Sequence, residues 1–211
     1  MPFAAPIPRC PTCPIGVAAA PGHCPFERAK HGPKRRLRLR GGPVERVMFI
    51  ARGYAVLTAG EGHRHLLRTP GSVVGWESLA RQPATHTLMT LTDCELCATD
   101  PETFRTFVAA RPALILPLLV AELASRDREA RYVSGPALVR VARFLLARLQ
   151  RGGAAFPLEL QNKSVARVLA LRPETFSRAL AQLRARGIVA EGAGVFVRDA
   201  TALAELAMGT G

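Results

Sequence analysis

The chain has 211 residues, of which 48% are hydrophobic, so it is long enough for two modest domains and is not mostly disordered. Its 29 Lys and Arg against 16 Asp and Glu give a formal charge of +13, which favours a polyanionic partner, although an Arg-rich, high-GC proteome would also raise the charge. No apolar run approaches the roughly 18 residues of a transmembrane helix, and the N-terminus has no secretory signal pattern. We therefore expect a cytoplasmic protein without a membrane partner.

Residues 1–30 form a Cys-bearing N-terminal segment that is rich in proline and has no periodic pattern, so we expect a loop here. Five cysteines in a cytoplasmic chain argue against disulfides and favour metal, cluster or redox ligands. Two of the spacings are C-x-x-C, which also fits a pair of zinc knuckles. On a strand, however, the two cysteines of the second pair would point to opposite faces, so Cys94 is expected to be a buried packing residue. The five are Cys10, Cys13, Cys24, Cys94 and Cys97.

Residues 31–110 predict a small antiparallel barrel or roll. Short strand-like runs alternate here with turns that are rich in glycine and proline. The basic alternation Arg36–Arg40 fits an edge strand, where cationic side chains discourage edge-to-edge pairing. The other expected strands are Val44–Ile50, Tyr54–Thr58, His65–Leu67, Val73–Val74 and Leu88–Leu96.

The pattern then changes to that of helices, with a short helix expected at Pro101–Val108. Residues 111–134 are expected to hold a long helix and a hinge, with the hinge signal at Ser134–Pro136. Pro117 should kink the long helix or delay its start. One stripe of this helix predicts either a dimer seam or a face that packs on the roll. The stripe consists of Leu114, Leu118, Ala121 and Ser125.

Residues 135–211 predict a winged helix-turn-helix domain. A helix at Pro136–Gln150 is followed by a shorter one with Val165, Val168 and Leu169 on one face, and by a tight turn at residues 170–172. Pro173 suits the first turn of the next helix, because its missing N–H costs nothing there. That helix turns Phe176, Leu180 and Leu183 inward and ends at Gly187, and a hairpin of Ile188–Ala190 and Val195–Val197 forms the wing.

The helix after this turn carries Glu174, Ser177 and Arg178 near its N-terminal front, which suits the reading of base edges in a major groove. An ordinary amphipathic surface helix is the alternative. Arg167, Lys163 and the wing near residues 192–194 are expected to hold phosphates, which fixes register without reading sequence.

A roll, a long helix, a hinge and a winged helix, in this order, resemble the CRP/FNR superfamily of transcription regulators. Four motifs resemble the FNR branch: the glycine-bounded turn Pro70–Trp76, the C-P-F of Cys24–Phe26, the E-T-F-S-R of Glu174–Arg178, and Cys97 followed by the E-T-F of residues 102–104. The resemblance covers roughly residues 24–198. The chain departs from that branch in three places. Ten residues separate Cys13 from Cys24, more than in that branch, and the segment from Cys24 to Gly41 is shorter, lacking a first helix and a strand. The long helix and its junction to the DNA-binding domain are also a few residues short, and these departures bear on the dimer geometry more than on the DNA-reading chemistry.

The resemblance implies an α+β fold in which residues 31–110 form a cyclic-nucleotide-binding-type β-roll that acts as the sensor domain and residues 111–134 form the dimerisation helix and hinge. It also implies a homodimer that reads a palindrome of TTGAT-like half-sites, with RNA polymerase as a further partner. It also implies an oxygen-sensing 4Fe–4S cluster on Cys10, Cys13, Cys24 and Cys97, because such a cluster takes one thiolate per iron. Oxygen converts the cluster of that branch to a smaller form, and DNA affinity then falls. The alternatives are structural zinc, or a thiol redox switch without a cluster.

A cyclic nucleotide is not the expected ligand. Its site needs a Gly-Glu pair for the ribose and an Arg beside a small hydroxyl residue for the phosphate. Here Trp76 follows Gly75, residues 83–87 contain no Arg, and Arg81 lies too early.

The three histidines of the roll could be ligands, including for haem. We expect instead that they are exposed and scattered, without a ligand role. An iron–sulfur or thiol oxidoreductase would need acid/base groups that the sequence does not offer, so we expect no enzyme. The histidines are His63, His65 and His86.

Overall fold

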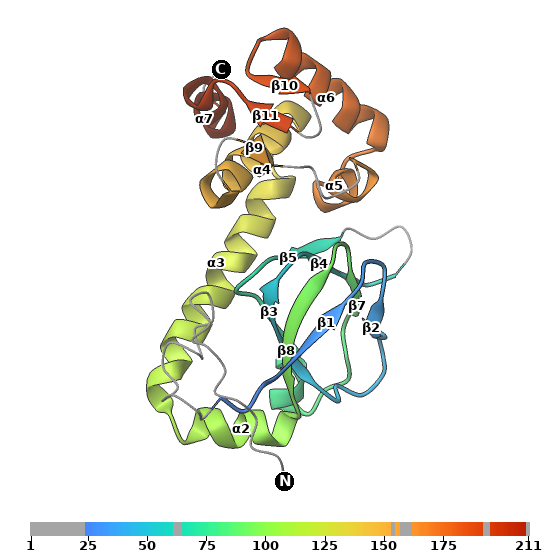
Figure 1. Ribbon diagram of the computed structural model, residues 1–211, viewed down its shortest axis with the longest axis vertical. Helices are drawn as coiled ribbons and strands as arrows, with labels where there is room; N and C mark the ends of the chain where they lie inside the picture. The colour runs from blue at the N-terminus through green and yellow to red at the C-terminus, as the bar shows by residue number, and fades with distance from the viewer. Residues whose placement is uncertain (1–23, 61–64, 153–154, 157–161, 192–194, 210–211) are drawn as a thin grey trace. The chain divides into compact units, whose positions relative to one another are not determined.

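The computed structural model describes residues 24–60, 65–152, 155–156, 162–191 and 195–209. The chain divides into two compact units, Met1–Arg126 (unit 1) and Asp127–Gly211 (unit 2), whose elements are labelled in Figure 1. No single helix among the described residues is long and apolar enough to cross a membrane. Only the pair Pro101–Ala109 and Pro112–Val133 has that length and composition jointly, and a bend of 104° interrupts it.

Unit 1 is built on two antiparallel four-stranded sheets. One has the strand order β1-β8-β3-β6 and the other the order β2-β7-β4-β5, so the predicted roll is confirmed. The basic strand β2 lies at the edge of its sheet, as its alternating arginines predict. The strands are β1 (Glu27–His31), β2 (Arg36–Arg38), β3 (Val47–Arg52), β4 (Ala55–Thr58), β5 (Leu66–Arg68), β6 (Val73–Val74), β7 (Thr87–Thr90) and β8 (Cys94–Thr99), with a 3-10 helix η1 (Trp76–Ala80).

Two features of the roll differ from the prediction. The run expected as one strand, Leu88–Leu96, is divided into β7 and β8, which belong to different sheets. Backbone N–H groups of Leu91 and Thr92 donate to the Tyr54 carbonyl, and the Tyr54 N–H donates to the Thr92 hydroxyl, so the chain is held where it crosses between the sheets. The second difference is β1, which falls in a segment that shows no strand pattern because four of its five side chains are exposed.

The roll has two apolar clusters, one on each face of the β1-β8-β3-β6 sheet. Alternate residues of β3 supply them: Val47 and Phe49 face one cluster, and Met48 and Ile50 face the other. The first cluster, called the helix-side cluster below, also contains Phe26, Val73, Cys97, Phe104, Phe107, Leu114 and Leu118. The second, called the roll interior, also contains Ala55, Leu57, Val74, Leu88, Cys94 and Leu96.

Two helices follow the roll. The predicted first helix is confirmed as α2 (Pro101–Ala109), whose N-cap Asp100 accepts from the Thr103 N–H at 2.8 Å. A 3-10 turn η2 (Pro112–Leu114) precedes α3 (Ile115–Val133). Pro117 therefore lies in the first turn of α3, where a missing N–H breaks no intrahelical bond. Of its two predicted effects, Pro117 shows the delayed start.

The stripe predicted as a dimer seam packs on the roll instead. Leu114 and Leu118 belong to the helix-side cluster, and Ser125 is buried as well. Of the two alternatives for this stripe, packing on the roll is confirmed for Leu114 and Leu118, so these two residues are not free to form a dimer seam. A different face of α3 is apolar and exposed, and half or more of each of its side chains is accessible: Ile115, Leu116, Leu119, Val120 and Leu123.

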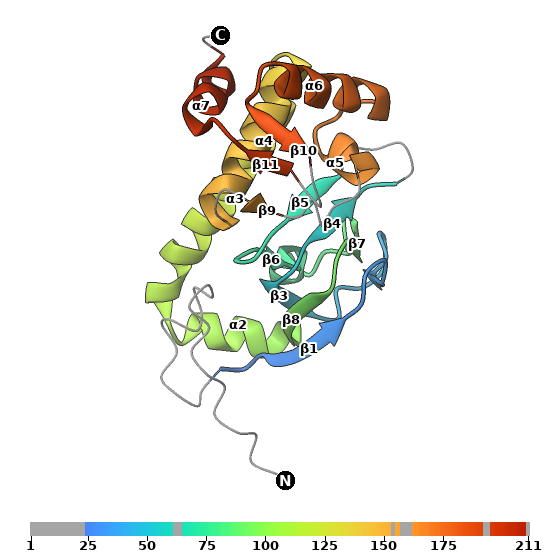
Figure 2. The same ribbon diagram turned by 45° about the horizontal axis from the view of Figure 1, so that its top comes forward.

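Unit 2 has the predicted winged helix-turn-helix arrangement, which Figure 2 shows from a second side. Its three-stranded sheet has the order β10-β11-β9, so the predicted hairpin gains a third strand that the sequence did not indicate. The C-terminal helix α7, also not predicted, packs on α4. The elements are α4 (Ala137–Gly152), β9 (Ala155–Phe156), α5 (Asn162–Val168), α6 (Pro173–Ala185), β10 (Val189–Glu191), β11 (Val195–Val197) and α7 (Ala200–Met208).

Candidate functional site

A tight turn joins α5 to α6. The Leu171 N–H donates to the Ala166 carbonyl at 2.8 Å, and Ala170 has a left-handed backbone with φ of 52°. A non-glycine residue in this conformation costs on the order of 1 kcal/mol, so the packing on either side must hold the turn. Arg172 is the N-cap of α6 and Pro173 its first residue, as predicted.

The two faces of α6 differ in the way that the sequence predicts. Phe176, Leu180 and Leu183 are buried against the rest of unit 2. Glu174 and Arg178 are exposed one turn apart on the opposite side. The helix ends at Ala185, with Arg186 rather than the predicted Gly187 as its C-cap. Gly187 follows with φ of +70° and donates from its N–H to the Arg184 carbonyl. The structure thus brings together the three predicted reading residues, with Ser177 exposed beside Arg178.

The predicted phosphate-holding residues Lys163 and Arg167 are exposed one turn apart on α5. The wing turn at residues 192–194 lies outside the described residues. From residue 162 to residue 185 the chain carries five Lys and Arg against one acidic residue, Glu174. All of these cations except Arg184 are exposed, and cations at this density suit a surface that meets the phosphates of a duplex.

Of the predicted cysteine ligands, two can be placed. Cys97 on β8 belongs to the helix-side cluster, and Cys24, which precedes β1, packs against the same cluster. The pairing of β1 with β8 brings Cys24 to the same cluster as Cys97, since Arg28, which follows Cys24 closely in the chain, lies opposite Cys97 in the register. Cys10 and Cys13 lie outside the described residues. Within the described ranges, no three His, Cys, Asp or Glu side chains are grouped so that they could hold a metal ion.

Cys94 lies on the other face of β8, in the roll interior. Its thiol donates to the Tyr54 carbonyl at 3.3 Å, and burial raises its pKa, which outweighs the opposing hydrogen bonds at Thr92. Cys94 is therefore held as a neutral thiol with a packing role. Because Cys94 and Cys97 face opposite ways, they do not form the second knuckle of a zinc site.

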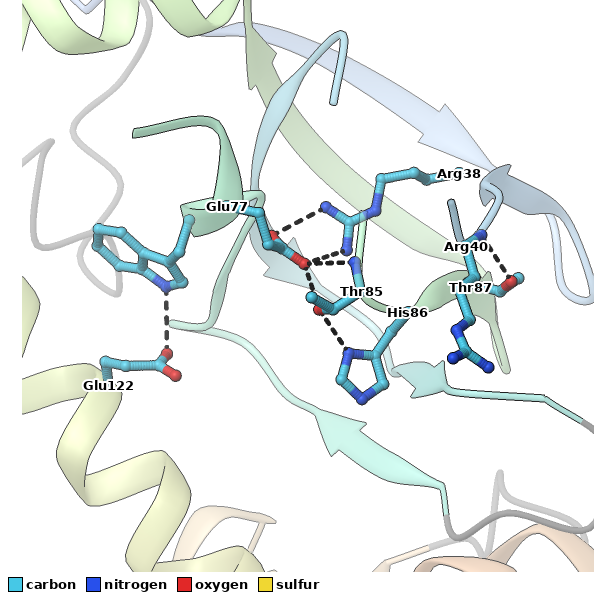
Figure 3. A network of polar contacts seen from close by, with 8 residues as sticks. Arg38, Arg40, Glu77, Thr85, His86, Thr87 and Glu122 are labelled. Atoms are coloured by element: carbon cyan, nitrogen blue, oxygen red, sulfur yellow. Dashed lines mark hydrogen bonds and ion pairs between the residues drawn. The ribbon is translucent and has the colours of Figure 1, made fainter. Parts of the chain in front are cut away.

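The roll also contains a polar network that the sequence did not reveal (Figure 3). The buried guanidinium of Arg38, on β2, donates twice to the Glu77 carboxylate, at 3.2 and 3.3 Å. Thr85 donates to the same carboxylate from its hydroxyl, at 2.8 Å, and from its N–H, at 3.3 Å. Since that hydroxyl hydrogen is committed to Glu77, His86 must donate from Nδ1 to the Thr85 oxygen, 2.8 Å away.

The pKa values in this network follow from burial and charge. Burial raises the pKa of Glu77, but its hydrogen bonds to the backbone and to Thr85 and the charge of Arg38 outweigh burial and lower it overall. Burial lowers the pKa of His86; Glu77 opposes this, whereas the neighbouring arginines add to it. His65 is buried, contrary to the expectation of exposed histidines, and His63 lies outside the described residues.

Two family models match the chain, and together they cover more than two thirds of it. Residues 32–111 match a cyclic nucleotide-binding domain. Residues 139–206 match a Crp-like helix-turn-helix domain. Curated protein sequences give no match.

The fold is similar to several solved structures. FixK2 from Bradyrhizobium japonicum is 20% identical with a TM-score of 0.73, over 86% of this chain and 96% of that chain. A CRP-family transcriptional regulator from Thermus thermophilus is 22% identical with a TM-score of 0.70, over 85% and 96%. A CRP/FNR-family regulator from the same organism is 23% identical with a TM-score of 0.65, over 88% and 100%.

Proposed function

Because residues 32–111 match a cyclic nucleotide-binding domain and residues 139–206 match a Crp-like helix-turn-helix domain, we propose that the chain is a DNA-binding transcription regulator of the CRP/FNR superfamily. The proposal places it in the FNR-like branch, where DNA binding is coupled to oxygen or redox state. The observation that carries this proposal is the placement of Cys24 and Cys97 at one apolar cluster, with Cys94 turned away from it. The proposal has three parts: a DNA-reading helix, a dimer face and a cysteine-held cluster.

The DNA-reading part rests on the exposed front of α6. Arg178 is proposed to donate to guanine acceptors, and Glu174 to accept from a cytosine amine, with Ser177 assisting. These three residues lie together on the exposed face of a helix whose other face is buried, which is the arrangement of a recognition helix. The proposed target is a palindrome of TTGAT-like half-sites. Lys163 and Arg167, on α5, are proposed to hold phosphates and fix the register.

The dimer part rests on the exposed apolar face of α3. Leu116, Leu119 and Leu123 follow one another at intervals of three and four residues, and each has at least half of its side chain accessible. An apolar stripe of this kind on a helix is costly to leave in water. A second copy of the chain, presenting the same face, is the proposed occupant, and RNA polymerase is the proposed further partner of the dimer.

The sensing part requires four thiolates. Cys24 and Cys97 fit this requirement, because both reach the helix-side cluster, while Cys10 and Cys13 would supply the remaining two. A 4Fe–4S cluster, when bound by four cysteines, supplies a group whose state responds to oxygen and redox conditions. The neighbours of Cys24 and Cys97, among them Phe26 and Phe104, would exclude water from that side of the site. A cyclic nucleotide is not the proposed ligand, since Glu77 already engages Arg38.

Two variants on one strand test the sensing part. We expect the protein purified without oxygen to be coloured and to carry about four irons per chain. Cys97→Ser should lose both the colour and the iron, whereas Cys94→Ser, which removes a thiol from the same strand but on the other face, should keep them. A colourless protein that contains zinc, or an equal iron content in both variants, would contradict the proposal and favour the zinc or thiol-switch alternatives.

A further inference from the structure

The junction between α3 and α4 joins the end of the proposed dimer helix to the part of unit 2 that carries α6. It consists of Ser134, Gly135 and Pro136, and Gly135 has a left-handed backbone with φ of +88°. A glycine followed by a proline is a common sign of a flexible hinge. The contacts around this junction, however, indicate a rigid connection.

Arg143, on α4, ties the end of α3 to the end of α7. Its Nη1 donates to the Ser134 carbonyl at 2.9 Å, the Ser134 hydroxyl at 3.1 Å and the Arg131 carbonyl at 3.2 Å. Its Nε donates to the Ala207 carbonyl at 2.7 Å. Arg131 and Ala207 lie in the last turns of their helices, whose carbonyls have no intrahelical partner and carry partial negative charge. The guanidinium of Arg143 therefore donates to carbonyls at the C-terminal ends of two helices, α3 and α7.

Arg140, one turn earlier on α4, ties the junction to the turn of the helix-turn-helix. Its Nε donates to the Gly135 carbonyl at 2.7 Å. Its Nη1 donates to the carbonyls of Leu169, at 3.3 Å, and Ala170, at 3.5 Å. Ala170 is the left-handed residue in the turn between α5 and α6. Arg140 thus connects the hinge to the turn that aims the recognition helix.

An aromatic contact adds to these polar ties. Tyr132, near the end of α3, meets the buried Phe144 of α4 edge to face, with ring centroids 5.7 Å apart. All of these residues belong to unit 2, which begins at Asp127 and includes the last part of α3. The end of α3 and the helix-turn-helix are therefore braced together rather than joined by a free hinge.

We propose that Arg140 and Arg143 are positioning residues that fix the direction in which each subunit presents α6, and thereby set the spacing between the two half-sites that the dimer accepts. This inference rests on the proposed function as a dimer that reads a palindrome. A dimer binds two half-sites well only when both recognition helices are presented at the matching separation. The contacts of Arg140 and Arg143 hold the turn before α6 to the last turn of α3, within unit 2.

Lysine substitutions provide a clean test, because they keep the positive charge but replace a fork of donors with a single point. A lysine cannot reproduce the several carbonyl contacts of either arginine. The variants are Arg140→Lys and Arg143→Lys, and the matched control is Arg186→Lys, at the exposed C-terminal end of α6. Any loss of affinity in the first two then reflects geometry rather than weaker attraction to phosphate.

The measurement is the affinity for a series of duplexes that carry two TTGAT-like half-sites with spacers of different lengths, and for a duplex with a single half-site. The wild type should prefer one spacer over those a base pair longer or shorter. Arg140→Lys and Arg143→Lys should lose this spacer preference. They should bind the preferred spacer about tenfold more weakly, which corresponds to the loss of one charge-assisted contact. Their binding to the single half-site should change less than about twofold, which shows at the same time that unit 2 is folded.

Two results would overturn the inference: variants that keep the spacer preference of the wild type, or variants that lose affinity for the single half-site by the same factor. The second result would mean that the arginines only stabilise the fold or contact phosphate. Failure of the wild type to bind a TTGAT-like half-site at all would count against the proposed function itself, so the two failures are distinguishable.

Discussion

The candidate DNA-binding charges of unit 2 and the Arg38–Glu77 pair of unit 1 differ in their surroundings. Unit 2 exposes Glu174, Arg178 and Arg167, each held in place by the buried face of its own helix. Unit 1 buries the guanidinium of Arg38, which meets a carboxylate 39 residues away in the sequence. The exposed charges of α5 and α6 are available to a partner, whereas the buried pair in unit 1 stabilises the roll. Substitutions in the buried pair should therefore change the free energy of unfolding, whereas substitutions of the exposed charges on α5 and α6 should change DNA affinity.

The largest effect is expected from the buried pair. Glu77→Gln leaves the Arg38 charge with a weaker partner, and we expect the free energy of unfolding to fall by about 2–3 kcal/mol, because hydrogen bonds to charged groups are the strong ones. Chemical denaturation would measure this. Glu102→Gln, which alters an exposed carboxylate with a partner on its own helix, Arg105, should change stability little. Equal effects of the two variants would contradict the comparison.

The same pair predicts a pH dependence. Since the pKa of Glu77 is lowered in the folded protein, its stabilising contribution is fully present above the ordinary pKa of 4.5. The contribution is lost as the pH falls through the lowered value. The stability difference between the wild type and Glu77→Gln should therefore be constant near neutral pH and shrink below about pH 4.5. A difference that grows on acidification would contradict the ion-pair account.

In unit 2, Arg178→Ala should leave unfolding nearly unchanged and weaken DNA binding. We expect a loss of about 1–3 kcal/mol, with relaxed specificity at one base-pair position, because a base-edge contact is removed. Competition between duplexes that differ at single positions measures this effect. Uniform weakening on all sequences would mean that Arg178 contacts the backbone instead.

The smallest effect is expected from Arg167→Ala. A phosphate contact carries no sequence information, so affinity should fall by about 1 kcal/mol or less on every duplex. The salt dependence of binding should also lose about one unit of slope. A change in sequence preference would contradict this assignment and would move Arg167 to the reading face.

The local parts of the fold could be predicted from the sequence, and the non-local parts could not. The helix-turn-helix was predictable because Pro173, Phe176 and Leu180 act within one or two turns of each other. The exposed face of α6, with Glu174, Ser177 and Arg178, was predictable for the same reason. Strand β1 was not, since its side chains are exposed and only pairing with β8 defines it.

The buried network and the exposed apolar face of α3 were missed for a physical reason. Arg38 looked like one of several surface cations, and nothing local signals that Glu77 and Thr85 meet it. On α3 the sequence showed apolar residues on more than one face and could not say which the roll would cover. The structure resolves this, because Leu114 and Leu118 join the helix-side cluster and leave Leu116 and Leu119 exposed.

One measurement tests the central claim most directly: the affinity of the anaerobically purified protein for a palindrome of TTGAT-like half-sites, before and after exposure to air. The account predicts tight binding before exposure and a fall of at least about tenfold afterwards, together with loss of the colour and iron of the cluster. A colourless protein that contains zinc and binds the palindrome equally well in air would contradict it.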